Sequence, residues 1–144
     1  MKKYYYILLI GICSCSAPKA INQYRTLPDK SKERVGYWVE KDKDEFGEYI
    51  AKGNYKDGVK TGTWKTTYQG KKYHVEKINK EGIATVKFFH PNGKVMEKGK
   101  TKMINSSSFI SWEKFGEWKY YDDKGKLIKV TDYTLIKNIE PRAK

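Results

Sequence analysis

The pattern Gly-x-Trp occurs three times in this chain, and each copy opens a segment of similar texture. The copies are Gly36-Tyr-Trp38, Gly62-Thr-Trp64 and Gly116-Glu-Trp118. Each is followed by a run rich in aromatic and β-branched residues, and then by a glycine turn with a basic residue. Self-similarity of this kind limits the fold to repeated supersecondary units that lie side by side.

Two of these segments align closely, GTWKTTYQGKK at 62–72 and GEWKYYDDKGK at 116–126, and ATVKFFHPNGKVMEKG at 84–99 is a diverged copy. No stretch of useful length has the i, i+3, i+4, i+7 apolar spacing of a helix. Strand-forming residues alternate instead with turn signals such as Asp57-Gly58 and Pro91-Asn-Gly93. We therefore predict an all-β chain of antiparallel hairpins.

The alternation of side chains along a strand predicts where the aromatics lie. Trp64 and Tyr68 are four residues apart and point to one face of their strand. If residues 69–72 form the loop, Tyr68 faces Tyr73 across the hairpin, and aromatic pairs of this kind contribute about 0.2–1 kcal/mol each. The residues that we predict for a binding surface are Trp64, Tyr68, Tyr73, Trp118 and Tyr120. Several of them must be core, and the sequence does not say which face is buried.

The pattern Gly-x-Trp-x-x-Tyr, then Gly-Lys, then Tyr-x-x-Gly-x-x-x-Gly-x-Trp resembles the variant MORN repeat of many bacterial proteins, some of which are labelled antitoxin-like. The resemblance covers roughly residues 35–133. It places Trp38, Trp64 and Trp118 on the family's tryptophan position, and Gly58, Gly62 and Gly116 on its turn glycines. The family implies an elongated, twisted antiparallel sheet of repeated β-hairpins, and it implies no catalytic centre.

The first residues have the layout of a secretory signal peptide. Lys2 and Lys3 precede a short apolar run at 4–12, which is too short to span a bilayer as a permanent helix. Both cysteines of the chain, Cys13 and Cys15, follow this run. We therefore read the N-terminus as an export signal and not as part of the fold.

The end of this segment resembles the lipobox of bacterial lipoproteins, in which a small residue precedes a cysteine that is lipidated and becomes the new N-terminus. Ser14 gives Cys15 the small neighbour that a cleavage pocket requires, whereas Cys13 follows the bulky Ile12. The alternatives are an ordinary secreted protein cut near Ala17, and a Cys-x-Cys metal or disulfide site. The resemblance implies a lipid anchor such as palmitate at Cys15, in the cell envelope and most simply in a Gram-negative outer membrane.

Three regions follow: a signal peptide at 1–14, a lipidated tether at 15–34, and a MORN-like β-repeat domain at 35–144. Residues 16–34 contain two prolines and no apolar periodicity, which is typical of a flexible linker. Residues 101–115 interrupt the repeat with the run Ser106–Ser108. We expect a long loop there, which packs over the sheet or contacts a partner.

Positive charge dominates the composition, with 30 Lys+Arg against 17 Asp+Glu. Removal of residues 1–14 takes away two lysines and lowers the net charge from +13 to +11. An exported protein meets no cytosolic nucleic acid, so we expect none as a partner. The lysines then protect exposed sheet edges, or they attract a protein, an anionic lipid or lipopolysaccharide of the envelope.

The sequence contains no familiar catalytic or cofactor motif. HExxH, GxSxG, Walker and GxGxxG patterns are absent, and no cysteine follows Cys15. The acidic run at 42–45 lacks the spacing of an EF-hand and favours a solvated hairpin loop. We expect no cofactor and no metal. His74 and His90 are the acid–base candidates, and we expect both at the surface or at a sheet edge.

The sequence thus predicts a non-enzymatic envelope lipoprotein whose sheet surface binds a protein or an anionic partner. The alternative suggested by the family label is an antitoxin-like or immunity-like inhibitor of one specific toxin. A small cell-wall hydrolase is a third hypothesis, which the missing catalytic motifs disfavour. A fold by itself does not decide between these functions.

Overall fold

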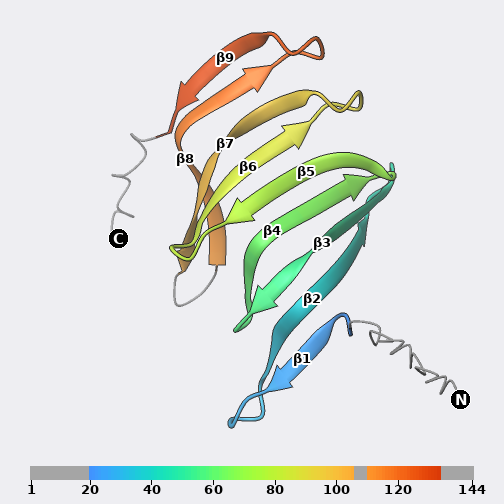
Figure 1. Ribbon diagram of the computed structural model, residues 1–144, viewed down its shortest axis with the longest axis vertical. Coiled ribbons are helices and arrows are strands. Elements are labelled where there is room, and N and C mark those ends of the chain that lie inside the picture. The colour runs from blue at the N-terminus through green and yellow to red at the C-terminus, as the bar shows by residue number, and fades with distance from the viewer. Residues whose placement is uncertain (1–19, 106–109, 134–144) are drawn as a thin grey trace, which may run out of the picture.

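The computed structural model of the protein describes residues 20–105 and 110–133. These residues form one open sheet of nine antiparallel strands and contain no helix. Strands that follow one another along the chain are neighbours in the sheet, so β1 lies at one edge and β9 at the other (Figure 1). The predicted all-β antiparallel fold is confirmed.

The strands are β1 (Gln23–Thr26), β2 (Lys32–Lys43), β3 (Glu48–Lys56), β4 (Val59–Tyr68), β5 (Lys71–Ile78), β6 (Ile83–Phe89), β7 (Val95–Asn105), β8 (Ile110–Tyr121) and β9 (Leu127–Asp132). In the part of the chain that the structure describes, no helix is long and apolar enough to cross a membrane. The turn signal at Asp57-Gly58 is confirmed, because both residues have positive φ and join β3 to β4. Such turns match the twist of a hairpin.

The turn between β4 and β5 is tighter than the sequence indicated. Gln69-Gly70 alone makes the turn with positive φ at both residues, and Tyr68 pairs with Lys71. A register shift in this ladder leaves Tyr73 without a direct partner on β4. The ring centroids of Tyr68 and Tyr73 still lie 6.1 Å apart. The predicted contact between these rings therefore arises from a β-bulge and not from a four-residue loop.

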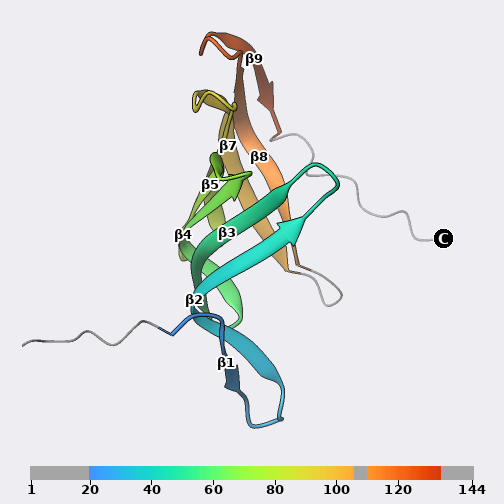
Figure 2. The same ribbon diagram turned by 90° about the vertical axis from the view of Figure 1, so that its right-hand side faces the viewer.

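One side of the sheet, which we call the aromatic face, holds the core. Its tryptophans Trp38, Trp64 and Trp118 are 6%, 1% and 0% exposed. A single-layer sheet can bury side chains so deeply only if it curls, and Figure 2 shows β2, β3 and β8 bending toward one side. Trp112 of β8 lines the same cavity as Val59 of β4, which confirms that distant strands approach each other across this face.

Two glycines make room for two of these tryptophans. Gly53 of β3 lies against Trp64, and Gly99 of β7 lies against Trp118. A Cβ atom at Gly53 would meet the indole at 2.2 Å, and one at Gly99 would meet it at 2.4 Å. Each indole Nε1 also donates a hydrogen bond to the carbonyl of the residue after its glycine. The same local arrangement thus occurs at two places in the sheet.

The sheet begins earlier along the chain than the sequence indicated. Strand β1 lies inside the expected tether at 15–34, and β2 starts at Lys32. Arg25 of β1 forms ion pairs with Glu33 of β2 and with Asp57 in the turn between β3 and β4. The contact with Asp57 joins residues 32 positions apart, and no local sequence pattern indicates it.

Residues 101–115 also differ from the long loop expected there. Strands β7 and β8 run to Asn105 and from Ile110, and they pair along this stretch. Alternating polar and apolar residues are a strand pattern, which the serine run obscured. That run at 106–108 lies outside the described residues, as do the signal peptide at 1–14 and Cys15.

Candidate functional site

The side of the sheet opposite the aromatic face carries lysines in a row. Cross-strand pairing runs from β3 to β8 through Lys52, Lys65, Val75, Lys87, Lys98 and Lys119, each the direct partner of the next. Side chains alternate along a strand, so Lys65 points away from the face that holds Trp64. We call the five lysines the lysine row and this side of the sheet the lysine face.

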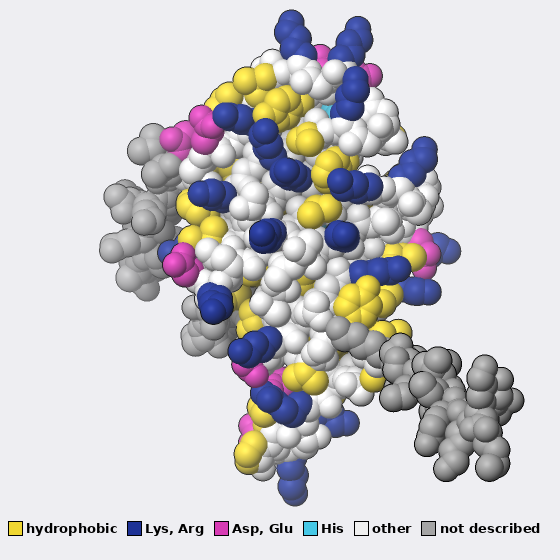
Figure 3. Space-filling model, in the orientation of Figure 1, with side chains coloured by type: hydrophobic (Ala, Val, Ile, Leu, Met, Phe, Trp, Pro, Cys, Tyr) yellow, Lys and Arg dark blue, Asp and Glu magenta, His cyan; other side chains and the backbone are white. Residues whose placement is uncertain are grey.

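The lysine row concentrates like charge. Adjacent strands are about 4.8 Å apart, so the row spans about 24 Å of the sheet. Among the described residues, Lys52, Lys65 and Lys87 form no ion pair. Figure 3 shows Lys and Arg side chains spread over this face, with Asp and Glu mainly at its margins. Like charges directly opposite each other destabilise a sheet, so the row costs the fold stability.

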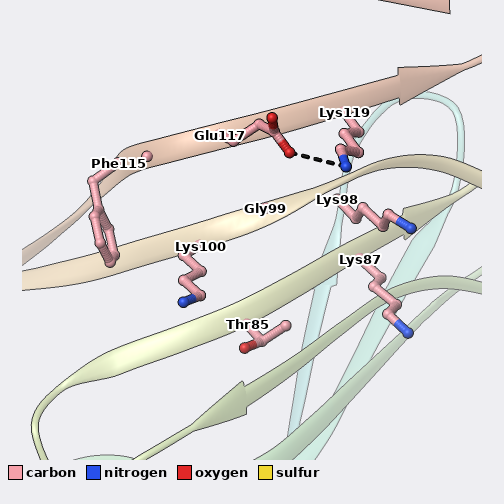
Figure 4. A pocket seen from close by; sticks show the side chains of 9 residues that line it. Thr85, Lys87, Lys98, Gly99, Lys100, Phe115, Glu117 and Lys119 are labelled. Carbon is pink, nitrogen blue, oxygen red and sulfur yellow. Dashed lines mark ion pairs between the residues drawn. The ribbon is translucent and has the colours of Figure 1, made fainter. Parts of the chain in front are cut away.

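An open cavity of about 390 Å³ lies over the end of the lysine row that β6, β7 and β8 form (Figure 4). Its lining includes Thr85, Lys87, Lys98, Lys100, Phe115 and Lys119. Glu117, the carboxylate that also lines it, lies 2.9 Å from the Lys119 ammonium group. That hydrogen-bonded pairing raises the pKa of Lys119. The cavity thus has an excess of positive charge and suits an anionic group.

Cations on the aromatic face, in contrast, have partners within the chain. The Arg34 guanidinium lies 4.9 Å from the Trp38 ring centre and 5.2 Å from that of Tyr55. It also lies 2.7 Å from the Glu40 carboxylate. Burial, together with the hydrogen bond that its hydroxyl donates to Glu40, raises the pKa of Tyr55 to about 12. This group of side chains belongs to the packing of the core.

Lys114 plays the same part near the other edge of the aromatic face. Its Nζ lies 3.0 Å from the Glu97 carboxylate and 3.9 Å from the Trp118 ring centre. Burial, the largest single influence, lowers the pKa of Lys114, but the hydrogen bonds and charge interactions with Glu97 and Tyr120 together outweigh burial and raise it. The hydroxyls of Tyr120 and Tyr133 lie 3.0 Å apart beside this pair. Tyr120, one of the predicted binding residues, is therefore part of a packed and hydrogen-bonded cluster.

The structure divides the remaining predicted binding residues into two groups. Trp64 and Trp118 are fully covered and are core residues, because a buried indole offers no surface to a partner. Tyr68 and Tyr73 are half-buried and form a tyrosine cluster with Tyr49, whose ring centre lies 4.5 Å from that of Tyr68. Sequence reasoning missed Tyr49, since its pairing with Tyr68 depends on the β3–β4 register.

An apolar groove of about 250 Å³ lies beside the tyrosine cluster. Its apolar lining is Tyr68, Tyr73, Phe89, Pro91 and Met96. Lys72, which also lines it, holds its Nζ 3.7 Å from the Phe89 ring centre. Ligand pockets in proteins are typically apolar with a few polar groups, and this groove has that character.

A further cavity, of about 290 Å³ on the aromatic face, contains His74, Glu76 and Lys114 in its lining. His74 was expected at the surface or an edge, but it stacks on Phe88 at 4.3 Å, and burial lowers its pKa to about 4. Burial also raises the pKa of Glu76. His90 donates a hydrogen bond from Nε2 to a backbone carbonyl of β8. None of the described residues that line this cavity is a serine or a cysteine.

Metal binding has no support in the part of the chain that the structure describes. Within residues 20–105 and 110–133, no group of three or more His, Cys, Asp or Glu side chains is arranged to hold a metal ion. The site that sequence reasoning missed is the lysine row, because its members are far apart along the chain and only the register brings them together. The chain matches no protein-family model, and no curated protein or solved structure is significantly similar to it.

Proposed function

We propose that this protein is a membrane-anchored lipoprotein of the cell envelope whose sheet is a non-enzymatic binding module for an anionic partner. The observation that carries the proposal is the lysine row, in which Lys87 and Lys98 are direct cross-strand neighbours. Such neighbours destabilise a sheet unless their charge is neutralised. An anionic partner supplies that neutralisation from outside the chain.

The anchor and the repeat architecture are parts of the same proposal. Acylation at Cys15 and removal of residues 1–14 are supported by the small Ser14 and the short apolar run before it. An elongated sheet of MORN-like hairpin repeats is supported by the matching arrangements of Gly53 with Trp64 and of Gly99 with Trp118. The proposal places the protein in the outer membrane of a Gram-negative cell and gives it no cofactor.

Metabolic labelling with a fatty acid, followed by membrane fractionation, tests the anchor. We expect the protein to carry the label and to sediment with membranes. Cys15→Ala should abolish both, whereas Cys13→Ala is the matched control and should keep both. A label that persists in Cys15→Ala would refute the assignment.

Recovery of the protein with its partners from membranes tests the binding role. An anionic partner held by the lysine row should be released as ionic strength rises. At 0.1 M salt the attraction between exposed charges already decays over a distance of about 10 Å, and this distance shortens as salt is added. A variant in which Lys87 and Lys98 are both replaced by glutamine should release its partner at lower salt. Partner binding that is unchanged by added salt and unchanged in the double glutamine variant would contradict the proposal.

The apolar groove favours a second candidate function, an antitoxin-like or immunity-like inhibitor of one toxin protein. Aromatic side chains in well-packed pockets provide most of the energy of protein–protein binding, and Tyr73 and Phe89 line such a groove. This function predicts a complex with one dominant partner, of fixed stoichiometry, that persists at high salt. Tyr73→Ala should abolish that complex and leave salt-sensitive binding by the lysine row intact.

A further inference from the structure

We propose that the lysine row seats the sheet on the anionic phospholipid headgroups of the bilayer that holds the Cys15 anchor. The inference rests on the proposed function, because the anchor supplies the bilayer. It adds the identity of the anionic partner and the side of the sheet that faces it. The aromatic face then points away from the bilayer and remains accessible.

The extent of the positive charge favours a surface over a small ligand. The row spans about 24 Å, whereas one small anion would touch one or two of its lysines. A second, shorter line of cross-strand partners adds Lys77, Thr85 and Lys100 to the same face. Several headgroups can meet such an array at once, and each basic side chain near an anionic bilayer contributes about 1 kcal/mol.

Exposed apolar side chains lie next to the row and favour a bilayer over a purely polar anion. Ile128 and Val130 of β9 are 64% and 47% exposed. Val130 is the cross-strand partner of Lys119, so it lies on the lysine face. Surfaces that bind the membrane interface combine basic residues with apolar ones that enter the headgroup region.

The short connection to the anchor limits how the sheet can lie. Cys15 precedes Ala20, the first described residue, by five positions, and five residues reach at most about 18 Å. The sheet therefore stays close to the bilayer. In Figure 2 the blue start of the described chain leaves the sheet toward the left, which is the side of the face shown in Figure 3. An anchor on that side brings the lysine face toward the headgroups.

Co-sedimentation with lipid vesicles tests the inference. The chain from residue 15 onward, carrying Cys15→Ser, excludes both the acyl group and the signal peptide, and it retains all nine strands. We expect binding at physiological salt to vesicles of phosphatidylcholine mixed with phosphatidylglycerol, and none to phosphatidylcholine alone. Replacing the five lysines of the row with glutamine should weaken binding by roughly a hundredfold or more, since each lysine contributes about fivefold.

The matched control removes the same charge from elsewhere on the surface. It replaces five exposed lysines in turns and at a strand end: Lys30, Lys43, Lys80, Lys124 and Lys126. This control should bind at least about tenfold more tightly than the row variant, because its lysines do not share one face. Equal loss in the two variants would overturn the inference, and so would the absence of phosphatidylglycerol-dependent binding.

The two proposals fail in different ways. Fatty-acid labelling at Cys15 without vesicle binding by the unacylated chain would overturn the seating of the lysine row and leave the lipoprotein assignment standing. Loss of specific labelling would overturn the anchor itself. Unchanged thermal unfolding of both lysine variants would show that a change in binding does not reflect a change in folding.

Discussion

The two faces of the sheet treat positive charge in opposite ways. On the aromatic face, Lys114 rests on the Trp118 ring and pairs with the Glu97 carboxylate. On the lysine face, Lys87 and Lys98 stand directly opposite each other, and Lys87 pairs with no described carboxylate. A cation that helps to pack this sheet thus receives a ring and a carboxylate from the chain. Lys87 has no such carboxylate among the described residues, which is consistent with the proposal that its charge meets an anion outside the chain.

The strongest test of this comparison uses two adjacent residues that point to opposite faces, Trp64 and Lys65. Trp64→Ala should lower the free energy of unfolding by about 3–5 kcal/mol, because it opens a cavity in the core. Lys65→Ala should change it by only about 0.5 kcal/mol in either direction. Urea denaturation measures both. A comparable loss in Lys65→Ala would mean that the lysine face also holds the fold together.

The glycines beneath the tryptophans provide the next largest effect. Gly53→Ala should cost about 2–3 kcal/mol, because its Cβ would overlap the Trp64 indole. Gly99→Ala should cost the same against Trp118. Combining Gly53→Ala with Trp64→Leu should cost less than the sum of the single changes, since the smaller side chain frees the space. Additive costs would show that the glycine and the indole do not depend on each other.

The strands could be predicted from the sequence where their signals are local. Turns such as Asp57-Gly58 marked strand ends correctly, whereas Gly-x-Trp lies inside β2, β4 and β8 and does not open these strands. Strand β1 was missed because Arg25 stabilises it through Glu33 and Asp57, which belong to other elements. The extension of β7 and β8 was missed because the serine run resembles a loop. Local composition therefore predicts the fold class, whereas long-range contacts determine where the sheet begins and ends along the chain.

The candidate site was much less predictable, because it depends on register. A shift of one residue moves every side chain of a strand to the other face. The sequence therefore selected Trp64 and Trp118 for a binding surface, whereas both are buried. It detected an excess of lysine but not that Lys87, Lys98 and Lys119 form one line. Bulges in the ladders place these partners, and no local pattern encodes them.

A pH dependence sharpens the description of the aromatic face. Burial lowers the pKa of His74 to about 4 from an ordinary value of 6.5. The unfolded chain therefore takes up this proton near pH 6.5, before the folded chain does. Stability is complete above pH 6.5 and should fall by roughly 2 kcal/mol as the pH drops toward 4. Thermal unfolding across this range measures the loss, and His74→Gln should remove it.

Glu76 lines the same cavity as His74, and its effect on the pH dependence of stability has the opposite sign. Burial raises its pKa, so its contribution favours the folded state below about pH 4.5 and is lost as the pH rises. A Glu76→Gln background isolates the histidine. Lys60 also lowers the pKa of His74, while Lys60 and Glu40 act oppositely on Glu76, so these two residues are kept unchanged. A flat profile in the Glu76→Gln protein would contradict the burial of His74.

Two lysines of the aromatic face give a smaller contrast. Lys114→Gln should lower the free energy of unfolding by about 1–2 kcal/mol, because Glu97 loses its cation in a half-buried place. Lys129→Gln is a control on the same face, since its Nζ lies farther from a ring, 5.6 Å from that of Tyr120. Lys129→Gln should lower the free energy of unfolding by less than Lys114→Gln does. Equal costs would mean that the ion pair with Glu97 adds nothing to the packing.

The smallest effect has the opposite sign and concerns the lysine row. Lys87→Thr should raise the free energy of unfolding by about 0.5 kcal/mol, because it removes a like charge opposite Lys98 and introduces a β-branched residue. Added salt should stabilise the unchanged protein more than this variant, since screening relieves the same repulsion. Urea denaturation at two salt concentrations measures both effects.

Lys77→Thr separates the two causes of that gain. Lys77 lies on the same face, but its cross-strand partners are Thr63 and Thr85, which carry no charge. It therefore gains the strand preference of threonine without relief of repulsion, and its response to salt should match that of the unchanged protein. If Lys77→Thr and Lys87→Thr behave alike, the row carries no electrostatic cost and needs no anion to offset it. A difference between them means that the sheet retains a repulsion between its lysines, which a bound anionic surface would relieve as added salt does.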